Sequence, residues 1–148
     1  MAWPINCSDA GCGKETWAAN IVELITSHRD DEGWLVCQCG MRGYVKKSFE
    51  MQEAGEPWEP YLRAIIPLGA TGDIYQPFVF VVSYQPDGPP DGVWFSYYKD
   101  LRPFGGRLKL GYGPGGPPVL DKTDVLRLVR NLRDIGCLSE TEIQDSLK

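Results

Sequence analysis

Continuous and alternating runs of apolar residues mark the middle of the chain as a sheet. Residues 78–82 read Phe-Val-Phe-Val-Val, an unbroken run of β-favouring residues, and residues 93–98 form a second run rich in aromatic residues. Prolines, glycines and aspartates dominate residues 85–92 between them, a composition typical of a turn. Residues 61–66 and 107–112 are two further candidate strands. The pattern predicts an antiparallel, aromatic-rich sheet within residues 61–112.

Helical spacing occurs before this sheet. Trp17, Ile21, Leu24 and His28 recur at intervals of four, three and four, which places them on one helical face. The spacing predicts a helix over residues 15–29, with Thr16 as its N-cap.

A second helical pattern follows the sheet. Gly136 is typical of the end of a helix, and Ser139 with Glu142 has the spacing of a capping box for the next one. Residues 121–147 are therefore predicted to form a helical hairpin. The stripe that would face the core consists of Val125, Leu128, Leu132 and Ile135.

Composition places the chain among ordinary globular proteins. Its 148 residues are 43% hydrophobic and 24% charged. No apolar run approaches the roughly 20 residues that span a bilayer, and no hydrophobic signal segment opens the chain. We therefore expect a cytoplasmic protein without a membrane partner.

Four of the five cysteines form two close pairs. Cys7 and Cys12 are separated by four residues, Cys37 and Cys39 by one, and glycines flank both pairs. Structural zinc takes four ligands in a tetrahedron, and glycine permits the sharp turns that bring two thiolates to one ion. The pattern predicts a closed Zn²⁺ site formed by Cys7, Cys12, Cys37 and Cys39.

The surroundings of the second pair carry a resemblance. Residues 34–36 read as a strand, residues 40–43 as a turn and residues 44–49 as a returning strand. This arrangement resembles one half of a zinc ribbon, with Cys7 and Cys12 as the other half, and a treble-clef-like variant is equally compatible. The resemblance covers residues 7–50 and implies a zinc-knuckle module.

Other uses of the cysteines stay open. Two disulfides, a thiol redox or metal-sensing site, or unrelated buried thiols would also account for them. Cys137 lies apart, at the turn of the predicted hairpin.

Catalytic chemistry finds no support in the pattern. His28 is the only histidine, and no nucleophile signature is present. Four cysteine ligands would also leave zinc without the open position that catalysis uses. We expect a non-enzymatic interaction or adaptor module, and leave a role of His28 undecided.

Two partner surfaces are candidates. Aromatic residues are enriched where proteins dock, so the hairpin and the Gly/Pro-rich loop are expected to meet another protein. This surface comprises Trp94, Tyr97, Tyr98, Phe104 and Tyr112. The alternative is a regulatory zinc ribbon that binds nucleic acid through Arg42, Lys46 and Lys47.

Charge weakens the nucleic-acid alternative. The net charge is −5, with 6 basic and 13 acidic residues in 1–98 but 9 basic and 7 acidic residues in 99–148. An acidic chain repels phosphate backbones at long range, although its last third is basic.

The predicted fold class is α+β. A zinc-knuckle or ribbon-like module with one helix spans residues 1–50, the sheet with its Gly/Pro-rich loops spans 51–118, and the helical hairpin spans 119–148. Together these parts are expected to form one compact unit.

Overall fold

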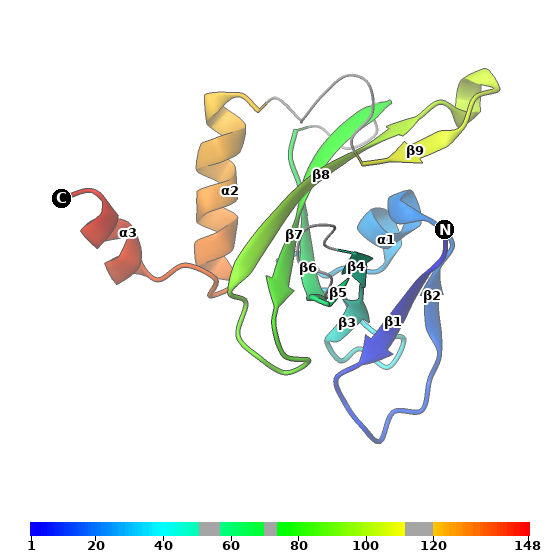
Figure 1. Ribbon diagram of the computed structural model, residues 1–148, viewed down its shortest axis with the longest axis horizontal. Helices are drawn as coiled ribbons and strands as arrows, with labels where there is room; N and C mark the ends of the chain where they lie inside the picture. Colours follow the sequence, from blue (N-terminus) through cyan, green and yellow to red (C-terminus); the bar gives the residue numbers. More distant parts are fainter. Residues whose placement is uncertain (51–56, 70–73, 112–119) are drawn as a thin grey trace.

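Seven strands form one antiparallel sheet in the computed structural model, which describes residues 1–50, 57–69, 74–111 and 120–148. Their order is β2-β1-β3-β6-β7-β8-β9 (Figure 1). The strands are β1 (Trp3–Cys7), β2 (Thr16–Ala18), β3 (Gly43–Lys46), β6 (Tyr61–Pro67), β7 (Tyr75–Ser83), β8 (Gly92–Asp100) and β9 (Leu108–Leu110). A separate pair joins β4 (Phe49–Glu50) to β5 (Pro57–Trp58). The α+β class is thus confirmed.

Helices lie on both faces of this sheet. They are α1 (Ile21–Ser27) and α2 (Lys122–Asp134). A third helix, α3 (Glu140–Ser146), follows α2 outside the core, and a short 3₁₀ turn, η1 (Arg102–Phe104), lies between β8 and β9. Figure 1 shows α2 beside one face of the long strands and α1 on the other side.

The unbroken apolar run of β7 is explained by the burial of both its faces. Successive side chains of a strand point to opposite faces. Phe78 and Phe80 enter the core with α1, whereas Val79 and Val81 enter the core with α2. Each fully buried side chain of this size stabilises the fold by about 1.5–3 kcal/mol.

The segment expected as one long helix is divided. Thr16 does not cap a helix but lies in β2, which pairs with β1 through Trp3 opposite Ala18. The helix begins later because Asn20 is its N-cap and accepts a hydrogen bond from the Glu23 amide. The predicted helix over residues 15–29 is therefore wrong for residues 15–20, and it ends at Ser27 rather than at residue 29.

The strands predicted on either side of Cys37 and Cys39 make fewer backbone pairs than expected. Residues 34–36 form isolated bridges rather than a strand, with Trp34 opposite Ala64 and Val36 opposite Arg42. The returning strand is β3, which joins β1 to β6. Segments 1–50 and 51–118 of the chain therefore contribute to one sheet.

The C-terminal helices are both present, but only one is built into the core. Leu128, Leu132 and Ile135 of the predicted stripe are buried, whereas Val125 is 45% exposed. The capping box of Ser139 and Glu142 is formed at the start of α3. No residue of α3 is buried, and Figure 1 shows it extending away from the sheet.

Candidate metal centre

Two loops carry the four paired cysteines. In the first, the chain leaves β1 at Cys7 and turns so that the Cys12 amide donates to the Asp9 carbonyl at 3.1 Å. The Asp9 carboxylate accepts the Gly11 amide at 2.9 Å and stabilises the turn. Gly13 then takes a φ of 61°, a conformation that suits glycine, before β2 begins.

The second loop closes on itself in the same way. The Cys37 amide donates to the Met41 carbonyl at 2.8 Å, and the Gly40 amide donates to the Cys37 carbonyl at 2.9 Å. Gly40 has a φ of 88°. This turn presents Cys37 and Cys39 from one short segment.

Pairing between strands holds the two loops face to face. Cys7 lies opposite Gly43 in the β1–β3 ladder, and the Ser8 amide donates to the Arg42 carbonyl at 3.0 Å. The fold itself therefore places the first cysteine pair next to the second.

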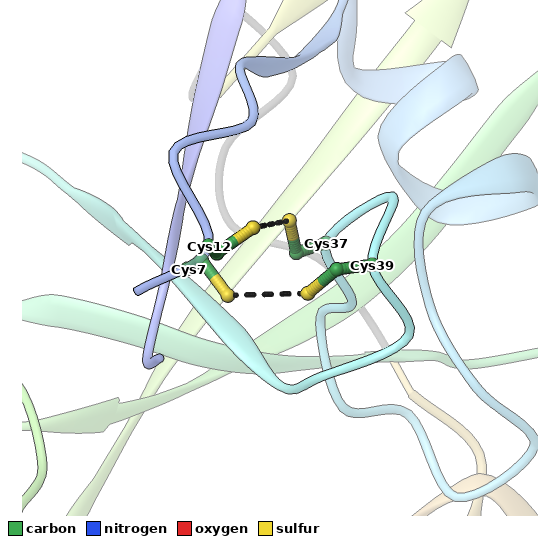
Figure 2. A group of neighbouring side chains, drawn as sticks. All are labelled: Cys7, Cys12, Cys37 and Cys39. Atoms are coloured by element: carbon green, nitrogen blue, oxygen red, sulfur yellow. Dashed lines mark hydrogen bonds between the residues drawn. The ribbon is translucent and has the colours of Figure 1, made fainter. Parts of the chain in front are cut away.

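The four sulfur atoms converge on one point, as Figure 2 shows. All four lie within 4.8 Å of one another, with Cys7 Sγ 3.4 Å from Cys39 Sγ and Cys12 Sγ 3.6 Å from Cys37 Sγ. A tetrahedral ion with bonds of about 2.3 Å would separate its sulfur ligands by about 3.8 Å. The residues thus fit a four-coordinate metal ion.

The two sulfur–sulfur distances also exclude disulfide bonds. A disulfide bond is about 2.05 Å long, far shorter than either contact. All five cysteines are unpaired in this sense, including Cys137.

Loss of hydration and hydrogen bonds give the four thiols different pKa values. Loss of hydration raises the pKa of Cys7 to about 12, despite the Asp9 amide that donates to its sulfur at 3.4 Å. The Lys14 amide lowers the pKa of Cys12, but lost hydration and the Cys39 and Cys37 thiols outweigh it, so this pKa is raised overall. In contrast, the Cys39 amide and the Thr16 hydroxyl lower the pKa of Cys37 to about 6.

The differences in pKa have an electrostatic cause. One thiolate is stabilised by donors directed at its sulfur, while further negative charge beside it is disfavoured. A cation bound among the sulfur atoms would compensate that charge.

Thr16 supports the centre from β2. Its hydroxyl accepts the Gln38 amide at 3.1 Å and lies 3.4 Å from Cys37 Sγ. Thr16 is only 1% exposed. No local sequence pattern indicates this role, because Thr16 fits equally well as a helix cap.

His28 lies outside the sulfur cluster. It ends α1, and its Nε2 is 3.6 Å from the Glu23 carboxylate. Within the described residues, the cluster contains cysteines alone.

The expected aromatic partner surface is largely internal. Tyr97 and Tyr98 are buried, which corrects the expectation that they face a partner, because Tyr98 packs in the core with α1 and Tyr97 packs against the Tyr75 ring. Trp94 is half-buried and stacks on Phe80 with centroids 5.3 Å apart. Phe104 is 70% exposed, and Tyr112 lies outside the described residues.

The three candidate nucleic-acid contacts are engaged within the chain. The Arg42 guanidinium lies 3.9 Å from the Trp34 ring centroid, and Lys46 pairs with Glu59 at 3.3 Å. Lys47 Nζ lies 4.7 Å from the Trp3 ring centroid, and burial lowers the pKa of this lysine. These contacts favour structural roles, so we do not propose nucleic-acid binding.

A groove beside the first metal loop was not anticipated. Its volume is about 380 Å³, and its lining includes Cys7, Asp9, Trp17 and Tyr44. Trp17 is 54% exposed because its side chain points away from the core side of β2.

Comparison with known proteins gives no relative for this chain. No family model, curated protein or solved structure matches it. None of the helices in the described ranges is long and apolar enough to cross a membrane.

Proposed function

We propose that this chain is a zinc-binding interaction module in which the metal has a structural role. The observation that carries the proposal is the convergence of Cys7, Cys12, Cys37 and Cys39, whose sulfur atoms lie within 4.8 Å of one another. Sulfur-only tetrahedral sites suit zinc or iron, and a single four-cysteine site fits one Zn²⁺ ion.

The ligand count supports a structural ion. Catalytic zinc keeps one position for water or substrate, whereas four thiolates fill the tetrahedron. The ion would join the end of β1 to the loop before β3, so it would stabilise one end of the sheet rather than open a reaction site.

The partner is proposed to be another protein. The metal loop forms one wall of the groove beside Trp17 and Tyr44, and a large exposed aromatic side chain is a common anchor at protein interfaces. Phe104 is a second exposed aromatic anchor, on the connection between β8 and β9. Zinc would thus shape a surface for binding.

Affinity capture with single variants tests the interaction role. Immobilised wild-type protein should retain a specific protein from lysate of its own source cells, and Trp17→Ala or Phe104→Ala should lose it. Both side chains are exposed, so neither variant should change the thermal melting temperature. The proposal would be contradicted if both variants retained the same protein as wild type. Turnover of a small-molecule class in a broad activity screen would also contradict it.

A further inference from the structure

The four sulfur atoms differ in how far the solvent reaches them. Cys37 is buried, Cys7 and Cys12 are half-buried, and Cys39 is exposed. An oxidant or electrophile that approaches the centre from solvent therefore meets Cys39 first.

Hydrogen-bond donors also distinguish Cys39 Sγ from the other three sulfur atoms. The Asp9 amide donates to the Cys7 sulfur, and the Lys14 amide donates to the Cys12 sulfur. The Cys37 sulfur has two donors, the Cys39 amide and the Thr16 hydroxyl. In the described part of the chain, no amide or hydroxyl donates to Cys39 Sγ, whose contacts are with the other cysteine sulfurs, at 3.4 Å with Cys7. Donors withdraw charge from a thiolate, so the thiolate without them is the stronger nucleophile.

The geometry also selects a partner for Cys39. Cys7 Sγ lies 3.4 Å away and comes from the opposite loop. A disulfide between these atoms requires their separation to shorten to about 2.05 Å.

We propose that Cys39 is a modification site, at which hydroperoxides oxidise the centre through a disulfide between Cys39 and Cys7. This inference rests on the proposed zinc centre. The Cys39 thiolate attacks one oxygen of the peroxide, the O–O bond breaks, and an alcohol or water leaves after protonation. Cys39 is then a sulfenic acid.

The second step closes the bond. The Cys7 thiolate attacks the Cys39 sulfur, the S–O bond breaks, and hydroxide leaves and is protonated to water. In total, two thiolates, one hydroperoxide and two protons give one disulfide, one alcohol and one water. The ion loses two of its four ligands and leaves the centre.

Oxidation would replace one link between the loops by another. Zinc joins the two loops through four sulfur atoms, whereas the disulfide joins them through Cys7 and Cys39 alone. Cys12 and Cys37 remain as thiols after the first equivalent of oxidant, with Cys37 still beside Thr16.

The test uses the full chain carrying Cys137→Ser, which removes the one cysteine outside the cluster. Metal content is measured first, and one equivalent of hydrogen peroxide is then added with a chromophoric chelator present. Free thiols are alkylated, and the disulfide is mapped by mass spectrometry. Because trypsin leaves each cysteine pair on one peptide, cleavage before Asp9 and fragment ions between Cys37 and Cys39 are needed for the assignment.

We expect one metal ion released per disulfide, a Cys7–Cys39 bond, and alkylated Cys12 and Cys37. A metal-bearing protein whose first disulfide joins Cys12 to Cys37, or two cysteines of one loop, overturns the inference and leaves the zinc proposal intact. A protein that carries no metal before oxidation overturns the zinc proposal itself.

Discussion

The hydroxyl of Thr16 lies 3.4 Å from the sulfur of Cys37, although the two residues belong to separate parts of the backbone. The same hydroxyl accepts the Gln38 amide, so its own hydrogen is free to point at the sulfur. This contact ties β2 to the second metal loop.

Thr16→Val should weaken metal binding. Valine keeps the shape but removes the donor to Cys37 and leaves the Gln38 amide without its acceptor. Loss of such an outer hydrogen bond typically lowers metal affinity about 10- to 100-fold. Competition with a chromophoric chelator measures this, with Thr16→Ser as the matched control that retains the hydroxyl. Equal affinity in the valine variant and wild type would show that the contact does not support the metal.

Cys37→Ser should lose the metal and loosen one side of the sheet. Binding of a structural zinc contributes on the order of 10 kcal/mol to folding of small modules. Amides of β1 and β3 should lose hydrogen-exchange protection, while β6 to β8 retain theirs through the core with α2.

The control for that variant is Cys137→Ser, which changes a half-buried cysteine outside the cluster. It should keep the wild-type metal content and the exchange protection of β1. A thermal melt of Cys37→Ser that matches wild type would mean that the cluster has no structural role.

Gly43→Ala should destabilise the contact between the two loops. An added Cβ would lie 2.7 Å from Ile5 Cγ2 and 2.8 Å from the Asn6 carbonyl oxygen, and the latter is backbone that cannot move aside freely. Overpacking of this kind costs about 1–3 kcal/mol. Gly11→Ala meets only an ordinary contact at 3.5 Å and should change little. Urea denaturation compares them, and equal midpoints for the two variants would contradict the strand pairing.

Leu132→Ala should test the second core. Leu132 is 6% exposed and packs between α2 and the sheet. Truncation of a buried leucine costs about 2–5 kcal/mol, whereas Leu126→Ala, at a 62% exposed position, should stay within about 0.5 kcal/mol. Free energies of unfolding from urea titration decide this. If both variants lose the same stability, α2 does not bury the face assigned to it.

The sequence pattern predicted those features that depend on neighbouring residues. Cysteine spacing predicted a group of four residues that the fold does bring together, because each pair lies in a single turn. Two runs of β-favouring residues and the turn residues between them predicted the antiparallel pairing of β7 with β8. The apolar stripe likewise identified the buried residues Leu128, Leu132 and Ile135 of α2.

Features that depend on distant pairing were not predicted. Trp17 fits a helical face by spacing, but Ala18 pairs with Trp3, and this long-range contact makes the segment a strand. Tyr97 and Tyr98 were expected at a partner surface, because the sequence of one strand does not reveal that Tyr98 packs in the core with α1 and Tyr97 against Tyr75. Thr16 supports Cys37 through a contact across 21 positions, which no local pattern encodes.

The metal content per chain decides whether the four clustered cysteines bind zinc. Protein purified without chelator should be subjected to elemental analysis, with a parallel count of thiols that react under native conditions. We predict one zinc per chain, with Cys7, Cys12 and Cys37 protected from the thiol reagent. A chain with no metal and five reactive thiols would contradict this prediction.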